Sequence, residues 1–251
     1  MKINEIKDIL NDNPDEKFLN SLHNDPRKGV QTALKQYYKR VESLQKKKEA
    51  FIKRFKYEKS FWNNGIEYVA GIDEVGRGPL AGPVVACAVI LPHDFNLIDV
   101  NDSKKLSEKK REELYNKILD QAVSVGIATG SCKLIDEVNI YEATRITMRN
   151  AVEKLSIKPE QLIIDAMDID TTIPQLKLIK GDQKSISVSA ASIIAKQYRD
   201  QLMKEYAEVY PGYEFEKNVG YGTKAHLKGL KELGVTPIHR LSFEPVKKNL
   251  K

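Results

Sequence analysis

The sequence predicts an α/β protein with a mixed central sheet flanked by helices, preceded by a small helical extension. From residue 67 onward, short apolar runs bounded by glycine or proline alternate with helix-length segments, which is typical of a sheet covered by helices. Before residue 67, apolar residues recur every three to four positions within a basic segment, which indicates a long amphipathic helix. The composition, with 41% hydrophobic and 30% charged residues over 251 positions, allows a packed core.

The first predicted domain, residues 1–66, is a helical basic extension. A helix is expected from Val30 to Phe55, because its apolar positions follow a repeat of 3.5 residues with one interruption at Lys48. We expect it to pack on a shorter helical segment around Phe18–Leu22 or on the rest of the protein. Trp62-Asn63-Asn64-Gly65 then form a connector to the second domain, 67–251, which we expect to fold without residues 1–65.

The net charge of +6 is concentrated in the first part of the chain. Residues 1–67 hold 15 Lys and Arg against 10 Asp and Glu, and Lys35–Lys59 holds ten basic against three acidic residues. This excess favours a polyanionic partner, and nucleic acid before a membrane. The alternative is a solvated helix surface that binds nothing.

The composition also bounds the location of the protein. The longest uncharged apolar run, Val84–Leu91, is too short to span a bilayer. The charged N-terminus lacks the apolar segment of a signal peptide. Cys87 and Cys132 form no CxxC motif, so we expect them to be buried and reduced in a cytoplasmic protein.

Within the second domain, strands are expected where apolar runs are bounded by turn residues. The expected strands are 68–73, 84–91, 123–129, 161–164 and 176–179. Helices are expected after the N-cap residue Ser107, around Met148–Leu155 and over Ser185–Tyr210, each with apolar residues at helical spacing. The face expected to be buried in the first of these helices comprises Leu114, Tyr115, Ile118, Leu119 and Ala122.

Three of the expected strands end at acidic residues: Asp73 and Glu74, Asp165, and Asp182. Each acid alone could be a helix cap or a turn residue. Four acids at three strand ends favour a shared site, because functional groups of α/β proteins gather at strand ends. Convergent carboxylates require a cation, and an all-oxygen set suits Mg²⁺ or Mn²⁺.

Asp73 and Glu74 raise a geometric difficulty, since consecutive strand residues point to opposite faces. The strand could break at Glu74, Glu74 could reach inward as the chain leaves the sheet, or its backbone carbonyl could be the ligand. The following loop contains Gly76, Arg77 and Gly78 and matches no phosphate-binding motif. It is either a tight turn or a backbone surface that approaches a ligand closely, such as the 2′-hydroxyl that distinguishes RNA from DNA.

Several stretches together resemble the ribonuclease HII family. They are GIDEVGRGPLAGPVV (71–85), DSKKLS (102–107), LIIDAM (162–167), KGD (180–182), SAASIIAK (189–196), GYGTKAH (220–226) and HRLSFEPV (239–246). The related ribonuclease HIII family is the nearest alternative, but it usually has GKG where this chain has Arg77. The chain departs from the usual pattern at Ala166-Met167 and at Val219, where the family often has Gly-Asn and lysine.

The resemblance implies an RNase H-like fold and hydrolysis of RNA in RNA–DNA hybrids. It also implies cleavage on the 5′ side of ribonucleotides embedded in duplex DNA, leaving 3′-hydroxyl and 5′-phosphate ends. The four acids would hold two divalent ions, Mg²⁺ or Mn²⁺. Gly76, Arg77 and Gly78 would contact the 2′-hydroxyl, and Tyr221 would pack on the next sugar.

The resemblance offers weaker candidates for phosphate contacts. They are Lys104, Lys105, Ser192 and Lys196. For Lys104 and Lys105 an ordinary exposed position is an equal alternative, and Ser192 could be small only to let a helix approach the sheet. We expect a monomer that binds hybrid or ribonucleotide-containing duplexes and no membrane. The rival from another class is a non-catalytic nucleic-acid-binding protein whose acids are structural.

Overall fold

A computed structural model describes residues 1–12 and 14–250, and the chain divides into two compact units, Met1–Ile52 and Lys53–Lys251. The predicted domain boundary between residues 66 and 67 stays a prediction. The last residue of the predicted second domain, 251, lies outside the described residues. Cys87 and Cys132 are free and buried, as expected. Among the described residues, no helix is long and apolar enough to cross a membrane.

The first unit is helical, as the sequence predicts. It contains α1 (Ile3–Asn11), α2 (Glu16–His23) and most of α3 (Lys28–Arg54). Its core consists of six buried side chains: Ile6, Leu10, Leu22, Val30, Ala33 and Leu34. In the middle of α3 the expected apolar stripe is exposed, with Val41 at 44% and Leu44 at 43%. Its last two residues, Phe51 and Phe55, are buried again at 6% and 4% exposure. Burial against α1 and α2 thus accounts only for the beginning of the pattern.

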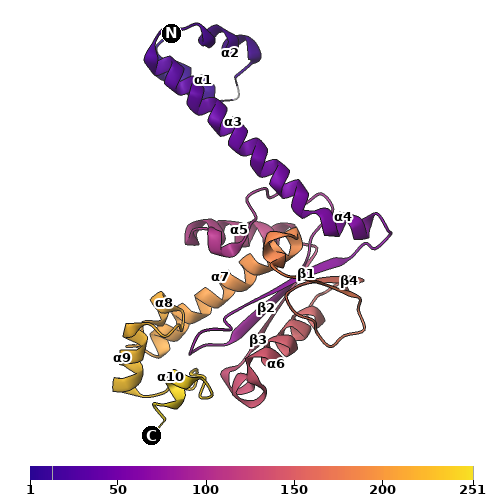
Figure 1. Ribbon diagram of the computed structural model, residues 1–251, viewed down its shortest axis with the longest axis vertical. Helices are drawn as coiled ribbons and strands as arrows, with labels where there is room; N and C mark the ends of the chain where they lie inside the picture. Colours follow the sequence, from indigo (N-terminus) through magenta and orange to yellow (C-terminus); the bar gives the residue numbers. More distant parts are fainter. Residues whose placement is uncertain (13, 251) are drawn as a thin grey trace. The chain divides into compact units, whose positions relative to one another are not determined.

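The second unit is built on a five-stranded mixed sheet with the order β3-β2-β1-β4-β5 (Figure 1). The strands are β1 (Val69–Val75), β2 (Val84–Ile90), β3 (Ser124–Gly130), β4 (Gln161–Asp165) and β5 (Gln175–Leu178). β2 is antiparallel to β1 and β3, whereas β4 is parallel to β1 and β5. All five expected strands are present, within two residues at their ends.

Helices cover both faces of this sheet. On one face, α6 (Cys132–Glu153) packs Met148 and Ala151 against alternate residues of β1 such as Ala70 and Ile72. On the other face, α7 (Ile186–Val209) lies so close to β1 that a Cβ on Gly71 would stand 2.2 Å from a backbone carbon of Ser187. A larger residue at position 71 would push α7 away from the sheet.

The remaining helices surround this core (Figure 1). They are α4 (Lys56–Trp62), η1 (Ser103–Lys105), α5 (Glu108–Gln121), η2 (Gly181–Gln183), α8 (Phe215–Asn218), α9 (Lys224–Leu233) and α10 (Glu244–Lys247). The predicted N-cap Ser107 accepts a hydrogen bond from Lys110 N at 3.3 Å. The prediction for Leu119 is wrong, because this side chain is 38% exposed while Leu114 and Ile118 are buried.

The helix α4 was not expected from the sequence, and the prediction that Trp62 belongs to a connector is wrong, because Trp62 is the last residue of this helix. Its residues Tyr57, Phe61 and Trp62 pack around a buried cluster that contains Val69 of β1 and Val188 of α7. The buried Glu58 accepts hydrogen bonds from the backbone N–H of Ser187 at 3.0 Å and its hydroxyl at 2.6 Å. A carboxylate at a helix N-terminus is stabilised by the unpaired N–H groups there. Residues 56–62 thus support the face of the sheet that carries α7.

Candidate active site

The sheet brings Asp73 and Asp165 together. β1 and β4 are parallel neighbours with Ile72 beside Ile164, so the next residue on each strand is one of these acids. Side chains alternate along a strand, and Ile72 and Ile164 face α6. Asp73 and Asp165 therefore both face α7. The expectation that acids at neighbouring strand ends meet is supported by the register.

Glu74 and Asp182 approach from different positions. β1 continues through Glu74 to Val75 and pairs with β2, so the suggested break at Glu74 is wrong. Glu74 lies 3.6 Å from the guanidinium of Arg77. Asp182 is in η2, directly after β5, where the Gly181 N–H donates to Asp165 Oδ1 at 2.7 Å. This hydrogen bond ties η2 to the end of β4.

The protein itself compensates the negative charge of the acids only in part, through Arg77 beside Glu74 and Lys104 near Asp182. Burial, followed by the neighbouring Glu74 and Asp165, raises the pKa of Asp73 well above its ordinary value. Burial also raises the pKa of Glu74, although Arg77 opposes this. Burial and then Asp102 and Asp165 raise the pKa of Asp182. Each shift shows that the ionised form is disfavoured where these side chains stand.

The donor set fits a hard divalent cation by its chemistry, because all four side chains are carboxylates and their mutual repulsion would be relieved by positive charge. In positions 1–12 and 14–250, however, no three His, Cys, Asp or Glu side chains already stand close enough to hold a metal ion. Asp165 and Glu74 instead engage Gly181 and Arg77. The residues fit a metal in type and neighbourhood, and their side chains would have to turn towards it.

The glycine loop is held from behind by two buried arginines. Arg240 donates to the carbonyls of Arg77 at 2.8 Å and Gly82 at 2.8 and 3.0 Å, and also to the carbonyl of Gly76. Arg199 donates to three further carbonyls, those of Ala81, Pro83 and Val219. Gly76 has a positive φ of 89°, and a Cβ there would lie 2.2 Å from Arg199 Nε. Only glycine fits this position.

Tyr221 lies beside this loop. A Cβ on Gly78 would stand 3.4 Å from Cε1 of the Tyr221 ring, which is ordinary contact distance. Arg77 and Gly78 are exposed and Tyr221 is 50% exposed, so these surfaces are accessible to a ligand. The structure therefore groups the residues expected to contact the ribose, although they are more than 140 positions apart.

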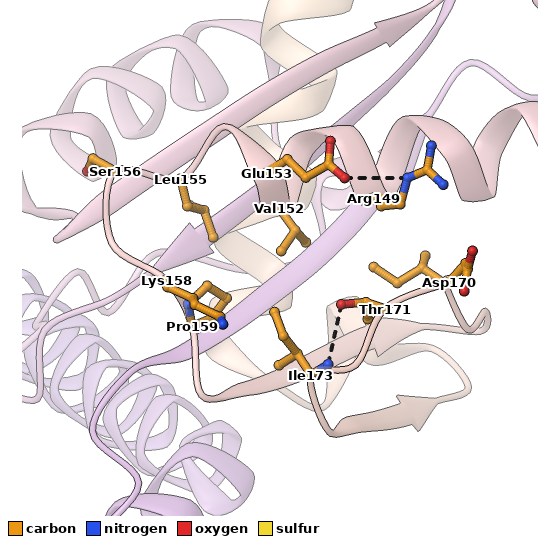
Figure 2. A pocket seen from close by; sticks show the side chains of 11 residues that line it. Arg149, Val152, Glu153, Leu155, Ser156, Lys158, Pro159, Asp170, Thr171 and Ile173 are labelled. Carbon is orange, nitrogen blue, oxygen red and sulfur yellow. Dashed lines mark hydrogen bonds and ion pairs between the residues drawn. The ribbon is translucent and has the colours of Figure 1, made fainter.

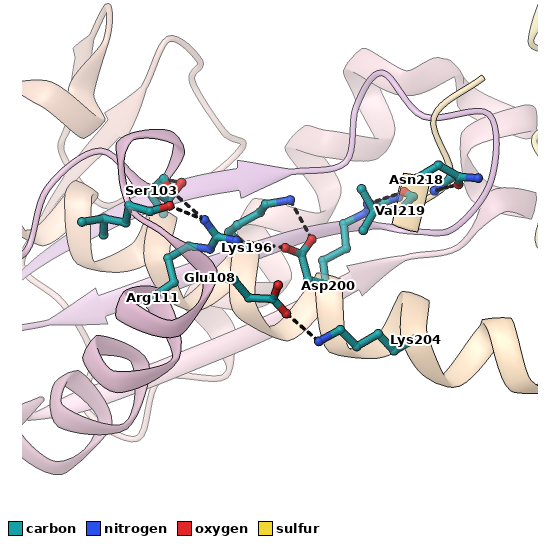
Figure 3. Close-up of polar contacts among 12 residues, drawn as sticks. Ser103, Glu108, Arg111, Lys196, Asp200, Lys204, Asn218 and Val219 are labelled. Atoms are coloured by element: carbon teal, nitrogen blue, oxygen red, sulfur yellow. Dashed lines mark hydrogen bonds and ion pairs between the residues drawn. The ribbon is translucent and has the colours of Figure 1, made fainter. Parts of the chain in front are cut away.

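The predicted phosphate-contact residues divide into two kinds. Lys104 and Lys105 are exposed on η1, near Asp182. Ser192 is buried, with its hydroxyl 2.9 Å from that of Ser103, and it also donates towards Asp73. Lys196 forms an ion pair with Asp200 at 2.7 Å (Figure 3). The contacts of Ser192 and Lys196 give both a structural role beside the predicted one.

A separate pocket of about 490 Å³ lies away from these residues, between the end of α6 and the loop before β5 (Figure 2). Val152, Leu155 and Ile173 contribute apolar surface to it, and Arg149 pairs with Glu153 at its edge at 3.6 Å. The four acids and the glycine loop take no part in its lining. The predicted site residues are therefore separate from this cavity.

Sequence reasoning missed the supporting residues Arg199, Arg240, His226 and His239. All four are almost completely buried, and all but Arg199 stand inside the quoted stretches GYGTKAH and HRLSFEPV. The available signal was a charged or titratable residue surrounded by apolar or turn residues. It was not used because its partners, backbone carbonyls of distant loops, leave no mark in the sequence.

Comparisons with known proteins agree with this arrangement. The family model described as Ribonuclease HII matches residues 70–246, and the model of the Ribonuclease HII N-terminal domain matches residues 2–62. A protein named Ribonuclease HII from Ligilactobacillus salivarius is 61% identical over 250 residues, covering 100% of this chain and 98% of that protein. The Ribonuclease HII of Lactobacillus delbrueckii subsp. bulgaricus is 59% identical over 247 residues, covering 98% and 96%. The solved ribonuclease H2 of Pyrococcus horikoshii is 29% identical, with a TM-score of 0.63 over 72% of this chain and 96% of that one.

Proposed function

Because the chain belongs to the ribonuclease HII family of metal-dependent endoribonucleases, we propose that it hydrolyses RNA within RNA–DNA hybrids. We propose further that it cuts on the 5′ side of single ribonucleotides in duplex DNA and leaves 3′-hydroxyl and 5′-phosphate ends. The names of the similar proteins favour this family over ribonuclease HIII. They also disfavour a binding protein without catalysis.

In this proposal Asp73, Glu74, Asp165 and Asp182 hold two divalent ions, Mg²⁺ or Mn²⁺. When bound, such a pair activates a water molecule and stabilises the leaving 3′-oxygen. The backbone of Gly76, Arg77 and Gly78 contacts the 2′-hydroxyl, and the Tyr221 ring packs on the adjacent sugar. Lys104, Lys105, Ser192 and Lys196 are the proposed contacts to phosphates.

One observation carries the proposal: two of the four carboxylates and the glycine loop belong to one strand-and-turn segment. Asp73 and Glu74 are in β1, the loop begins directly after β1, and the Tyr221 ring lies beside Gly78, where an added Cβ would stand 3.4 Å from it. A ribose held against Gly78 and Tyr221 therefore has its phosphates near Asp73. A structural role for the acids would not explain why the exposed backbone of Arg77 and Gly78 stands next to them, whereas Gly76 is buried and supports the turn.

The test is cleavage of an end-labelled DNA duplex that contains one ribonucleotide. Matched substrates are the same duplex without the ribonucleotide and a full RNA–DNA hybrid, each with Mg²⁺, with Mn²⁺ and with EDTA. We expect a single cut on the 5′ side of the ribonucleotide, extendable by a polymerase from its 3′-hydroxyl, only when metal is present. Asp182→Asn is the inactive control. Binding without cleavage, or cleavage in EDTA, would contradict the proposal.

A further inference from the structure

Two histidines behind the ribose-contact surface form a chain of hydrogen bonds that ends on Tyr221. His226, in the first turn of α9, and His239 are 0% and 2% exposed, and their Nε2 atoms are 3.0 Å apart. His226 Nδ1 lies 2.9 Å from the carbonyl oxygen of Tyr221. His239 Nδ1 lies 2.9 Å from the backbone nitrogen of Thr236. Every ring nitrogen of the pair is thus engaged.

The two ends of this chain fix where the protons are. The backbone N–H of Thr236 can only donate, so His239 Nδ1 accepts, and a neutral His239 carries its proton on Nε2. His226 Nε2 must then accept, which leaves the proton of His226 on Nδ1. The carbonyl of Tyr221 can only accept, so it takes that proton as a hydrogen bond. One tautomer of each ring satisfies all three contacts.

The surroundings keep both rings neutral. Tyr213 and Phe215 lie against both imidazoles, with ring centroids 5.1 to 6.1 Å apart. Burial lowers the pKa of His226, and burial together with His226 lowers the pKa of His239 to about 4. A second proton on His226 would place two N–H groups face to face between the rings. A second proton on His239 Nδ1 would face the Thr236 N–H, and the Thr236 hydroxyl, 2.8 Å from this nitrogen, would have to accept it instead of donating to the ring.

Tyr221 needs such a restraint because of its sequence neighbours. It stands between Gly220, which has a φ of 88°, and Gly222. Glycines leave the backbone free to rotate on both sides, and half of the tyrosine side chain is exposed. Its carbonyl is held by Thr223 N at 2.8 Å and by His226.

We propose that His226 and His239 are positioning residues that fix the Tyr221 backbone through this ordered proton chain, and so set how the enzyme holds the sugar beside the ribonucleotide. The inference rests on the proposed function, because it assigns the purpose of holding Tyr221. His226 acts directly on the carbonyl. His239 acts through His226 by fixing its tautomer.

The first measurement uses the wild-type chain and needs no activity. Long-range ¹H–¹⁵N correlation of the imidazole rings, in a protein with only 4 histidines, reports which nitrogen carries each proton. At pH 7 we expect neutral rings with the proton on Nδ1 of His226 and on Nε2 of His239. A proton on His226 Nε2, or a charged ring at either position, overturns the proposal.

The second measurement is a double-mutant cycle on the single-ribonucleotide duplex. His226→Leu should lower kcat/KM roughly tenfold, since small displacements of positioning groups have effects of at least that size. His226→Asn should recover part of the loss, because its side-chain N–H can replace Nδ1–H. In a Tyr221→Ala background, His226→Leu should cause no further loss. Additive effects of the two substitutions, or no recovery by asparagine in a folded variant, overturn the proposal.

The same double-mutant cycle can be measured without turnover, as the affinity of each variant for the duplex in EDTA. If the wild-type protein binds the duplex and shows the coupling but does not cut, the proposed function fails while the positioning role stands. If it cuts and the coupling is absent, the positioning role fails alone. Should His226→Leu not fold, the tautomers of the wild-type rings decide the question.

Discussion

The acidic side and the proposed ribose-contact side of the site meet in the continuous stretch 73–78 but differ in their electrostatics. Asp73 is buried next to other acids, and its ionised form is disfavoured. On the other side the buried charges are cations, and Arg240 and Arg199 are surrounded by the loop carbonyls that accept their hydrogen bonds. The acidic side is incomplete without an external cation. The ribose-contact side is already organised by the chain itself.

This difference predicts that substitutions on the two sides affect stability in opposite directions. Removing a carboxylate relieves repulsion and destroys chemistry. Removing a supporting arginine takes the donor from buried carbonyls and disturbs the fold. Function on the acidic side therefore opposes stability, whereas on the ribose-contact side it depends on the same hydrogen bonds as the fold.

The largest effect should come from Asp165→Asn. The loss of one ligand charge should lower turnover at saturating Mg²⁺ by roughly a thousandfold, since metal stabilisation of the transition state is worth several kcal/mol. The amide oxygen of the introduced asparagine can still accept the N–H of Gly181, so the fold and most of the duplex affinity should remain. Single-turnover cleavage and duplex binding in EDTA measure the two separately. Near-normal turnover would remove Asp165 from the site.

The next largest effect should come from removing the helix that supports α7. The measurement compares the thermal stability of two truncated chains, one that begins at residue 53 and one that begins at residue 66. The shorter chain loses Glu58 and the packing of Tyr57, Phe61 and Trp62 on the α7 face of the sheet. These three rings are partly buried, so each should contribute on the order of 1–2 kcal/mol, and together with the loss of Glu58 we expect this chain to melt far below the wild type. The chain from residue 53 should fold.

Thermal melts and circular dichroism of the two chains test this directly. Glu58→Gln in the full chain is the milder control, because glutamine retains one oxygen acceptor for Ser187. Equal melting temperatures for the two truncated chains would show that α4 is dispensable. That result would restore the expectation, drawn from the sequence alone, that the catalytic part folds without residues 1–65.

On the ribose-contact side, Arg240→Met should lower the free energy of unfolding by about 3 kcal/mol, because it leaves the buried carbonyls of Gly76, Arg77 and Gly82 without their donor. Chemical denaturation measures this. Lys133→Met is the control, since the Lys133 side chain is 85% exposed and pairs with Glu137 at 3.8 Å, so its loss should cost little. A loss no larger than that of the control would contradict the proposed support of the loop.

On the acidic side, a substitution should raise the free energy of unfolding instead of lowering it. Asp73→Asn should raise the free energy of unfolding of the metal-free protein by roughly 1 kcal/mol near pH 8. The folded-state pKa of Asp73 is raised above its ordinary 3.8, so its penalty is absent below about pH 4 and grows as the pH rises towards the folded-state pKa. The stability advantage of the Asp73→Asn variant should therefore be smaller at pH 5 than at pH 8.

Metal should remove this advantage. Because Mg²⁺ would bind the folded wild-type site, it should raise the wild-type melting temperature and leave that of the Asp73→Asn variant nearly unchanged. Melts at pH 5 and pH 8, with and without Mg²⁺, give all four comparisons. A wild-type protein that is more stable than the variant at pH 8 without metal would contradict the electrostatic contrast between the two sides.

The two sides also differ in how far the sequence predicts them. The acids could be predicted from the sequence because each follows an apolar strand, and the strand order brings Asp73 and Asp165 side by side. The role of Arg240 could not be predicted, because the carbonyls that accept its hydrogen bonds are more than 150 positions earlier in the chain. Helix α4 was missed for a related reason, since its short apolar face becomes meaningful only against Val69 and Val188.

The smallest effect should follow removal of residues 1–52, which belong to neither side. This unit carries eleven Lys and Arg against eight Asp and Glu, so its loss should weaken duplex binding through charge. Each lost phosphate contact reduces the slope of log K against log salt by roughly 0.9 for B-form DNA. The cut should stay at the same bond. The control is the full chain with Lys46→Gln and Lys48→Gln, which should reproduce part of the shallower slope. If the slope is unchanged in the truncated chain, the lysines of α3 only face water, and the basic excess of the N-terminal unit has no part in substrate binding.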